Sequence, residues 1–475
     1  MPLPHQWFRA PFLAAVLLAL VVQGVARASA AEAPGLGSIA YIQNGDLWVK
    51  DLPDGPAHQL TRGGGVDTPR WSPSGEWIAF RAGGQLRVVR RTGTDLRVVA
   101  GDLAGAFAWS PVADLLAYIT RGGLVVSTAD GARRQEITPP SNAAGAGVQS
   151  FAWSPDGSML AFSDVTILQP AQNGQPPVRA ARIVRVRADG SGTQEVYRAG
   201  RPASSGLLVA GWAPDGAFIL FWTVPGFSAS LLADGVPLLM VPATGGTPVQ
   251  LAGAMLAHPD LLDWSSASRQ LAIVEGGGRE TWSSKFMAVG RPPAPLRRVT
   301  GPGQAVLFPS WSPDGRQIAF TGGPAAPGLP SGDPALQAMA GRRIWVMAAD
   351  GSGQHPLTTD PCCRDEHPEW SADGRAILFA RLEGDRASVW LMDADGAHPR
   401  RVVDGLGPGP GGFGTYGLLE WGRFYDWTGR SGLRLAAPRL PTTGGAPQAL
   451  LLLAATISLT ALAVGWHIRR RLAPP

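Results

Sequence analysis

The two cysteines are the residues best suited to covalent chemistry. Cys362 and Cys363 are adjacent, and the chain has no other cysteine. In an exported protein such a pair is expected to oxidise, which would give a vicinal disulfide, a small ring that kinks the backbone rigidly. Two free thiols or a bond to another chain are the alternatives. We therefore predict the vicinal disulfide, with a ligand contact surface as its candidate function.

Acidic side chains and a histidine crowd the same stretch. Residues 359–369 read TDPCCRDEHPE and include Asp360, Asp365, Glu366 and His367. Carboxylate oxygens are the ligands that Ca²⁺ takes in proteins. Their spacing matches no metal-binding loop, however, and solvated acids beside an arginine are the simpler interpretation. Whether a metal binds here is left open, and no cofactor is expected.

Few residues have the types that acid–base catalysis needs. The residues just before a recurring tryptophan are mostly small or apolar, and the exceptions are Asp67, Arg70, Asp263, Glu369 and Glu420. His58 and His355 occupy the same position of the repeat, which indicates a structural role. The chain has no G-x-S-x-G nucleophile motif. The sequence therefore predicts no enzyme, although Asp263 and Glu420, which directly precede their tryptophans, keep that alternative open.

The recurring tryptophan belongs to a repeated phrase, and this repeat must position any functional side chain. WSPDGRQIAF at residues 311–320 returns as WSPSGEWIAF at 71–80, WSPDGSMLAF at 153–162 and WSADGRAILF at 370–379. The marker tryptophans lie about 50 residues apart on average, close to the length of a four-stranded propeller blade. They are Trp71, Trp109, Trp153, Trp212, Trp264, Trp311, Trp370 and Trp421.

Each repeat unit divides into four predicted strands. The first strand ends at the tryptophan, and Ser-Pro-Asp-Gly forms a tight turn in which Pro fixes φ and Gly takes a positive φ. The second strand is the IAF-like run, whose apolar residues alternate. The third strand, as at residues 344–347, closes on the hairpin signal Asp-Gly, and the fourth strand is short. The marker tryptophans are thereby explained as packing between blades.

The two ends of the repeat region complement each other. The chain enters with residues 39–42, 47–50 and 58–61, which match strands two, three and four, and it leaves with residues 418–421, which match strand one. A blade shared between the N- and C-terminal strands would close the ring and remove the exposed sheet edge. We predict an all-β propeller of eight four-stranded blades, with seven as the alternative.

The pattern WSPDG…IAF…DADG…LT resembles the TolB-like, WD-type β-propeller repeat family over residues 38–427. This resemblance implies the fold more strongly than the function, since the family includes periplasmic protein-binding subunits and the propeller halves of oligopeptidases. The predicted blade number is higher than in the six-bladed TolB type. The partners of that type are therefore not expected to apply here.

The N-terminal segment has the layout of a secretory signal peptide. Arg9 precedes an apolar run at residues 11–26, and Ala28-Ser29-Ala30 follows as a cleavage site. We predict a signal peptide over residues 1–30, with an uncleaved membrane anchor as the alternative. In either case the following part of the chain is exported.

The C-terminal segment combines three signals. Residues 449–466 carry no charge and have about the minimum length of a transmembrane helix, and the tail 467–475 contains Arg469, Arg470 and Arg471. The stalk at 428–448 contains a pentapeptide that resembles the LPxTG sorting signal of sortase substrates. The pentapeptide is Leu440, Pro441, Thr442, Thr443 and Gly444. This order predicts cell-wall attachment, and a simple single-pass anchor is the alternative.

Charge and composition exclude several function classes. The apolar fraction is 45% and the charged fraction 16%, so the chain is expected to fold rather than remain disordered. The formal net charge of +5 is accounted for entirely by arginines in residues 1–30 and 467–475, where acidic residues are absent. A nucleic-acid binder should instead carry a basic domain. Nucleic acid is therefore not an expected partner.

The topology indicates which face of the propeller should bind ligands. Long insertions at residues 164–182, 223–237 and 321–341 lie between strands two and three, on the same face as 359–369. Binding residues concentrate on such loops, although insertions are also merely tolerated there. We predict a monomeric, exported, cell-surface-anchored module that binds a protein, peptide or cell-wall ligand through the long-loop face, with a sortase as a further partner. The alternative is an extracellular hydrolase or lyase with its site at the channel mouth.

Overall fold

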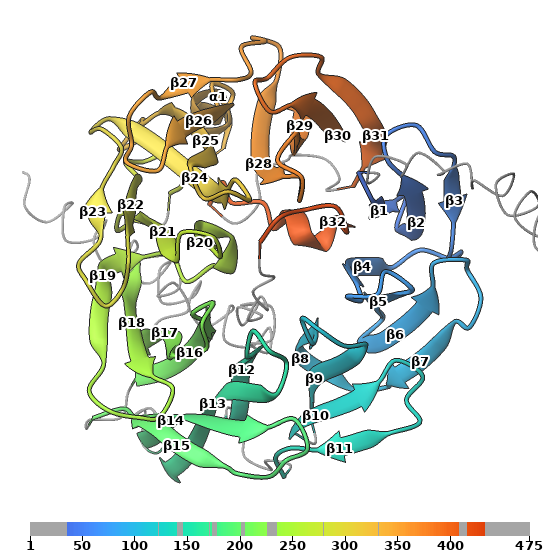
Figure 1. Cartoon of the computed structure of the whole chain (residues 1–475), viewed down its shortest axis with the longest axis vertical. Helices are drawn as coiled ribbons and strands as arrows, with labels where there is room; N and C mark the ends of the chain where they lie inside the picture. Colours follow the sequence, from blue (N-terminus) through green and yellow to red (C-terminus); the bar gives the residue numbers. More distant parts are fainter. Residues whose placement is uncertain are drawn as a thin grey trace, which may run out of the picture.

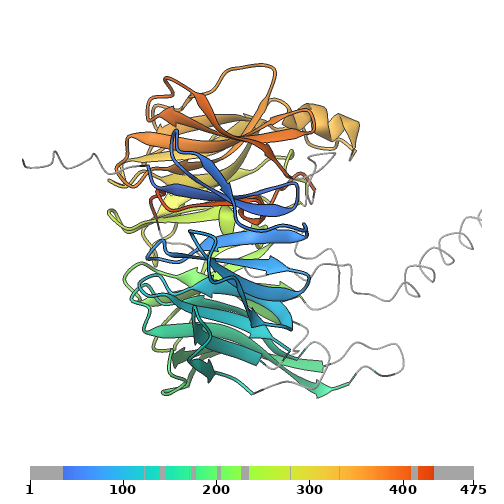
Figure 2. The same ribbon diagram turned by 90° about the vertical axis from the view of Figure 1, so that its right-hand side faces the viewer.

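Antiparallel sheets surround a central axis as the blades of a propeller (Figure 1). The computed structural model describes residues 36–432 except residues 122, 140–145, 171, 173–177, 201–204, 226–234, 279, 331 and 408–415. Viewed from the side, the blades form a thick disc with one short helix projecting from a face (Figure 2). The predicted all-β class describes these sheets, although one α-helix is inserted between two strands.

Six sheets have four strands each, and in each of them the chain runs from the inner strand outwards (Figure 1). The first three comprise β4 (Val66–Trp71), β5 (Trp77–Ala82), β6 (Gln85–Arg90), β7 (Arg97–Ala100); β8 (Leu103–Trp109), β9 (Leu115–Thr120), β10 (Gly123–Thr128), β11 (Arg134–Glu136); β12 (Gly147–Trp153), β13 (Met159–Gln169), β14 (Val178–Arg187) and β15 (Gln194–Arg198). The next three comprise β16 (Ser205–Trp212), β17 (Phe218–Pro225), β18 (Val236–Pro242), β19 (Val249–Met255); β20 (Leu262–Ser265), β21 (Gln270–Glu275), β22 (Phe286–Gly290), β23 (Arg297–Arg298); β24 (Gln304–Trp311), β25 (Gln317–Pro324), β26 (Arg343–Ala348) and β27 (His355–Pro356).

The seventh sheet has eight strands and corrects the predicted count. Its strands are β28 (Arg364–Trp370), β29 (Ala376–Glu383), β30 (Arg386–Asp393), β31 (Arg400–Leu406), β1 (Ser38–Gln43), β2 (Asp46–Asp51), β3 (Ala57–Gln59) and β32 (Tyr425–Trp427). The described strands therefore form seven sheets, and the prediction of eight separate four-stranded blades is wrong. The physical reason is a single residue pair, Gln43 with Leu406, which joins two groups of four strands into one sheet.

The C-terminal strand also differs from the predicted one. β32 pairs with β1 through Ile39 and Trp427, so the N- and C-terminal strands lie side by side. The residues predicted as this strand, 418–421, instead lead into the 3-10 helix η2 (Trp421–Arg423). Trp421 is therefore not the eighth marker tryptophan, and Trp427 takes that place.

The marker tryptophans connect neighbouring sheets through a repeated hydrogen bond. The indole Nε1 of Trp153 donates to the carbonyl oxygen of Ala108, at 3.1 Å, and Ala108 directly precedes the preceding marker, Trp109. The same bond joins Trp109 to Arg70, Trp212 to Ala152, and Trp311 to Asp263. Trp71 donates to Asp426, the residue before Trp427, at 3.2 Å. This bond identifies Trp427 as the marker that completes the ring.

The Ser-Pro-Asp-Gly turns form for the reason expected from sequence. The Ser312 hydroxyl donates to Asp314 at 2.6 Å and accepts from the Gln317 amide at 2.9 Å, so one side chain links both ends of the turn. Gly315 takes a φ of 68°, which a residue with a Cβ rarely adopts. These turns and the Asp-Gly hairpins lie on one face of the ring, called here the tight-turn face.

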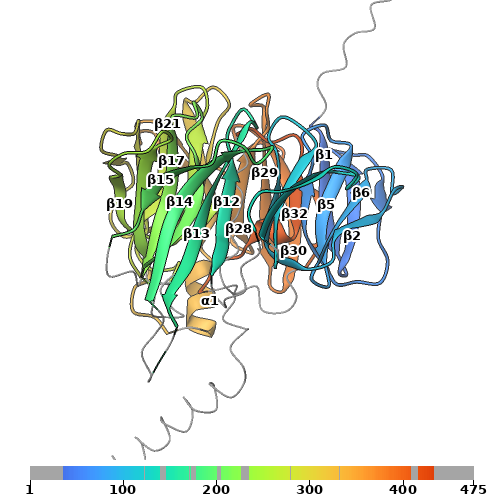
Figure 3. The ribbon, with the colours of Figure 1, turned by 90° about the horizontal axis from the view of Figure 1, so that it is seen from below.

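The opposite face, called here the long-loop face, carries the insertions. β13 and β14 are long strands, so most of the insertion predicted at 164–182 continues the sheet as a hairpin. The helix α1 (Asp333–Met339) lies on this face (Figure 3), where Ala335 and Met339 pack against Trp282. The 3-10 helix η1 (Pro259–Leu261) precedes β20 and shortens the inner strand of its blade.

The segments predicted at the two ends lie outside the described residues. They are the signal peptide 1–30, the pentapeptide Leu440 to Gly444 and the basic tail 467–475. The apolar segment 449–466 is not described either. In the part of the chain that is described, no helix is long and apolar enough to cross a membrane.

Candidate functional site

A cavity of about 110 Å³ lies at the centre of the ring, where several inner strands end at their marker tryptophans. Its walls come from β4, from η1 and β20, from β24, from β28 and from β32 with the residues that follow it. Because inner strands run towards the tight-turn face, the cavity lies on that side of the channel. It is called here the central pocket.

The central pocket collects charged side chains from distant parts of the chain. Four carboxyl groups and two guanidinium groups line it, together with the imidazole of His367 and the hydroxyls of Tyr425, Ser310 and Ser431. The charged residues are Asp260, Asp263, Glu369, Asp426, Arg70 and Arg430. Convergent ionisable groups in a concave site mark a candidate functional site.

Asp263 has a structural partner and an altered acidity. Its Oδ2 accepts the backbone N–H of Trp311 at 2.8 Å, so the side chain joins two neighbouring blades. Burial raises the pKa of Asp263 to about 7, although the hydrogen bond from Trp311 and the charge of Arg430 act in the opposite direction. At neutral pH this carboxyl group is therefore present in both protonation states.

Asp260 behaves differently from Asp263, although the two are close in sequence. Burial acts to raise the pKa of Asp260, but nearby positive charges outweigh it and hold the pKa below its usual value. These charges come from His258, His367, Arg70 and Arg430. Asp260 therefore stays ionised to a lower pH than an ordinary aspartate.

Glu369 has one carboxylate oxygen that no described residue satisfies. Its Oε1 accepts from Nη1 of Arg430 at 2.9 Å, in an ion pair. Its Oε2 is buried and accepts no hydrogen bond from the described part of the chain. A buried acceptor without a donor costs about 1–3 kcal/mol, which a ligand donor would recover. This oxygen is the clearest sign that the pocket receives a ligand.

Arg430 remains charged in this surrounding. Burial acts to lower the pKa of Arg430, but the charges of Glu369, Asp426 and Asp263 raise it above its usual value. Its Nε donates to no described residue, so a second polar atom at the pocket lacks a partner.

A β-bulge places His367 in the pocket. Between Glu366 and Glu369 the register of β28 shifts against β29, and His367 takes a φ of 58°. Thr68 and Phe308 have the same left-handed backbone in β4 and β24, and a proline follows each of the three. Histidine tolerates this conformation better than most side chains. The bulge turns the imidazole towards the channel instead of into the sheet.

His367 links a phenol to a carboxylate. Its Nδ1 is 2.7 Å from the Tyr425 hydroxyl, and its Nε2 is 4.0 Å from Oδ2 of Asp260. The ring also meets Phe308 edge-on, with centroids 5.3 Å apart. Depending on its tautomer, Nδ1 accepts from or donates to the Tyr425 hydroxyl, while Nε2 faces Asp260. This arrangement can hold, and in principle transfer, a proton.

Buried side chains close the pocket from the long-loop side. Leu418, Leu419 and Trp421 are buried and belong to the same hydrophobic cluster as Leu262 and Phe308 of the inner strands. The indole of Trp421 donates to Oε2 of Glu366 at 3.1 Å. The segment that was predicted as a strand therefore packs against inner strands and covers the pocket on this side.

Glu366 is the centre of a buried ion cluster behind this segment. Its Oε1 is 2.5 Å from Nη1 of Arg342 and 2.7 Å from Nη2 of Arg364, and its side chain has no exposed surface. Burial acts to raise the pKa of Glu366, but the charges and hydrogen bonds of the two arginines lower it to about 2. Arg342 also donates to the carbonyl oxygen of Gly417, which fixes this segment.

The stretch 359–369 was interpreted as one loop, and its second half is instead part of a strand. Residues Arg364–Trp370 form the inner strand β28. Because successive strand residues point to opposite sides, Asp365 pairs with Arg381, whereas Glu366 meets Arg342. The acidic residues are therefore separated, and Ca²⁺ binding by this set is not supported.

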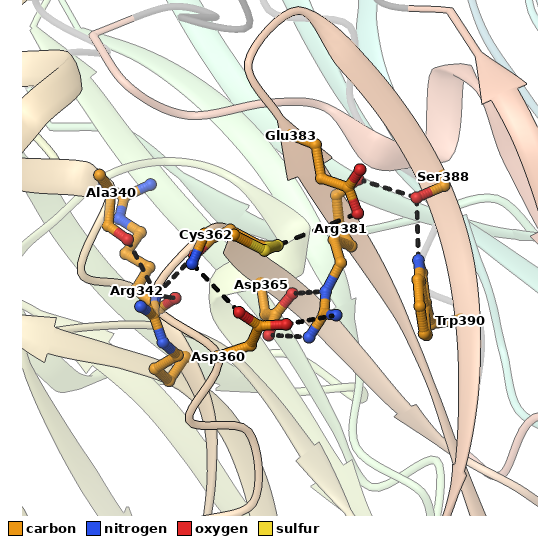
Figure 4. The surroundings of a disulfide bond; sticks show 11 residues. Ala340, Arg342, Asp360, Cys362, Asp365, Arg381, Glu383, Ser388 and Trp390 are labelled. Carbon is orange, nitrogen blue, oxygen red and sulfur yellow. Dashed lines mark hydrogen bonds and ion pairs between the residues drawn. A yellow bond between two sulfur atoms is a disulfide. The ribbon is translucent and has the colours of Figure 1, made fainter. Parts of the chain in front are cut away.

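The cysteines lie at the start of β28, on the long-loop face and away from the pocket. The sulfurs of Cys362 and Cys363 are bonded to each other, with Cys362 exposed and Cys363 buried (Figure 4). Asp360 accepts the amide of Cys362 at 3.1 Å and lies 3.7 Å from Arg381. In the described part of the chain, the group with metal-ligand spacing is Asp360 with the two sulfurs, which the disulfide occupies.

The pocket contains some of the residues that the sequence marked, and others besides. Arg70, Asp263 and Glu369 come together in it, whereas Asp67 and Glu420 do not line it. No feature of the sequence singled out Tyr425, Arg430 or Asp260. A signal existed for His367, since the pattern x-Pro-x-Trp occurs at residues 68–71, 308–311 and 367–370 and marks the bulged inner strands.

Comparisons with known proteins support the resemblance to TolB over a short segment. No family model matches the chain. The Tol-Pal system protein TolB of Rhizorhabdus wittichii is 37% identical over 73 residues, which cover 14% of this chain and 16% of that protein. TolB of Zymomonas mobilis is 36% identical over 73 residues with the same coverage. The match therefore spans less than a fifth of the relatives' length.

Solved structures support the propeller fold. Dipeptidyl peptidase 4 of Porphyromonas gingivalis has a TM-score of 0.53 at 10% identity and covers 76% of this chain and 56% of its own. A TolB of Agrobacterium tumefaciens gives 0.32 at 16% identity, covering 78% and 88%, and an oligogalacturonate lyase of Vibrio parahaemolyticus gives 0.44 at 12%, covering 78% and 99%. At such identities the likeness shows the fold alone. The likeness to dipeptidyl peptidase 4 therefore does not decide between catalysis and binding.

Proposed function

We propose that this chain is an exported propeller that binds its ligand through the central pocket, and that the ligand presents a positively charged hydrogen-bond donor. The tight-turn side of the channel replaces the long-loop face as the expected binding region, because buried side chains of residues 418–421 cover the pocket on the other side. The ligand class remains a protein, peptide or cell-wall component.

The observation that carries this proposal is Oε2 of Glu369, a buried carboxylate oxygen without a donor. The balance of charge in the pocket points the same way, since four carboxyl groups face two guanidinium groups. Even with Asp263 protonated, the carboxylates outnumber the guanidinium groups. A charged ammonium or similar donor would satisfy the oxygen and reduce the excess negative charge.

Binding of a small amine tests this proposal. The wild-type protein is titrated with propylammonium and with 1-propanol, two probes of similar length that differ in charge, by calorimetry or NMR. We expect propylammonium to bind more tightly than 1-propanol. In Glu369→Gln its affinity should fall about ten- to hundredfold, since a hydrogen bond to a charged group contributes about 1.5–3 kcal/mol.

Glu420→Gln is the matched control, because Glu420 is half-buried near the pocket but does not line it. This variant should bind propylammonium as the wild type does. Equal binding of the two probes, or an unchanged affinity in Glu369→Gln with a folded protein, would contradict the proposal.

Enzymatic activity is a second candidate function. It is favoured by the Tyr425 hydroxyl at 2.7 Å from His367, with Asp260 at the other imidazole nitrogen. In a hydrolase or lyase these three side chains could deliver a proton to a leaving group. Mass spectrometry of ligands recovered after long incubation separates the two candidates. Cleaved products that disappear in Tyr425→Phe and Asp263→Asn would favour catalysis over binding.

Location is proposed separately from the ligand. We propose that the chain is exported by residues 1–30 and joined to the cell wall at Thr443, on the basis of the sorting pentapeptide Leu440 to Gly444. Cell-wall digestion should then release a chain ending at Thr443 with a wall fragment, and Thr443→Ala should abolish this form. Recovery of chains that all end at Pro475 would exclude attachment by a sortase.

A further inference from the structure

We infer that the group bound in the central pocket is the free N-terminus of a peptide, recognised by its α-ammonium group together with the first peptide carbonyl. This inference rests on the proposed function and specifies its ligand. It follows from three features of the pocket. Hydrogen-bond donors lie beside acceptors, no apolar wall in the described part of the chain surrounds the space that a lysine side chain would need, and one side of the pocket is covered.

Hydrogen-bond donors lie beside the acidic acceptors within one small space. Arg70 and Arg430 line the pocket next to Asp260 and Glu369, and Nε of Arg430 donates to no described residue. The hydroxyl of Ser310 accepts from the Trp370 amide at 3.4 Å, which leaves its own hydrogen for an acceptor. A ligand that fits both kinds of group carries a charged donor and an acceptor a few ångströms apart. An α-ammonium group and its neighbouring carbonyl oxygen have this spacing.

The lining argues against a lysine side chain. A lysine ammonium is joined to four methylene groups, so a lysine pocket should have apolar side chains around these methylene groups and acidic groups at its end. In the central pocket polar side chains outnumber apolar ones, and the apolar lining residues are Leu262, Phe308 and three prolines. Burying four methylene groups against guanidinium and carboxyl groups would forfeit hydration of these groups without replacing it.

The size and closure of the pocket favour a chain end over an internal segment. With a volume of about 110 Å³, the pocket is small enough to favour a chain end. Leu418, Leu419 and Trp421 are buried, and Trp421 donates to Glu366 in the first half of β28, so this segment covers the pocket on the long-loop side. A ligand that enters from the tight-turn side therefore meets this segment.

Four probes test the inference with the full-length chain at pH 7, where an α-ammonium group of pKa about 8 is mostly charged. They are Ala-Ala-Ala-amide, its N-acetylated form, N-acetyl-Ala-Lys-Ala-amide and alanine amide, each titrated by calorimetry. We expect the free tripeptide to bind at least tenfold more tightly than either acetylated peptide. In Glu369→Gln this preference should fall below twofold, whereas Glu420→Gln should keep it. Circular dichroism and thermal unfolding verify that both variants fold.

Each of the other outcomes would contradict either this inference or the proposed function. Equal binding of the acetylated and free tripeptides would refute recognition of the N-terminus. Preference for the internal lysine would refute it too, while leaving the proposed function intact. Alanine amide carries the same ammonium and carbonyl groups, so it should bind about as tightly as the free tripeptide, and its failure to bind would refute recognition of these two groups. Failure of all four probes together with propylammonium would overturn the proposed function itself.

Discussion

Replacing Glu366 by glutamine should destabilise the protein strongly at neutral pH and only weakly in acid. The wild-type carboxylate has no exposed surface and neutralises two buried arginines, Arg342 and Arg364. Glutamine has nearly the same shape, so the change removes the charge and leaves the cavity filled. Removing one partner of a buried ion pair costs about 3–5 kcal/mol, because the other charge stays buried without compensation.

The pKa of Glu366 gives an independent value for the free energy that its ionised form contributes to folding. Its folded pKa is about 2, whereas the ordinary pKa of a glutamate is 4.5, and each unit corresponds to about 1.36 kcal/mol, so the ionised form contributes about 3 kcal/mol. Because the folded pKa is depressed, this stability is fully present above about pH 4.5. It is lost as the pH falls towards 2. The difference between wild type and Glu366→Gln should shrink over the same range.

Urea unfolding followed by tryptophan fluorescence at several pH values measures this difference. Glu136→Gln is the control, since Glu136 is 62% exposed and lies 3.7 Å from Arg134. Exposed ion pairs contribute at most about 1 kcal/mol, so this variant should resemble the wild type. Equal stability of Glu366→Gln and wild type at pH 7, or a difference that does not change with pH, would refute the reasoning.

Two further predictions concern Asp263 and the cysteines. Burial raises the folded pKa of Asp263 to about 7, so the wild type loses stability as the pH rises through 7, and Asp263→Asn should gain thermal stability relative to wild type between pH 4 and pH 8. A gap between the two melting temperatures that stays constant over this range would show that Asp263 is not buried as described. The bond between Cys362 and Cys363 closes a loop of two residues only, so the double variant Cys362→Ser, Cys363→Ser should lose about 1 kcal/mol in urea unfolding. A loss above about 3 kcal/mol would mean that the disulfide fixes much more of β28 than its own loop.

Local rules explain how much of the fold was predictable from sequence. The Ser-Pro-Asp-Gly and Asp-Gly turns act through neighbouring residues, as the bonds of Ser312 to Asp314 and Gln317 demonstrate. The alternation of apolar residues then defines the strands, and the repeat defines their stacking. The ends of the ring were harder to assign, because LLEW at residues 418–421 imitates a first strand. Its two leucines are apolar because they pack against inner strands and cover the pocket.

The pocket could be predicted only in part, and the reason is distance along the chain. Arg70, Asp263 and Glu369 could be marked because they precede repeat tryptophans, but their meeting depends on ring closure. Trp71 and Asp426 are 355 residues apart and are joined by a hydrogen bond of 2.7 Å. The sequence by itself determined the repeated blade, since turns and alternation are local. Only the tertiary structure decided which side chains face the axis and which side of the pocket is covered, because bulges such as that at His367 and the path of residues 416–424 depend on packing between blades.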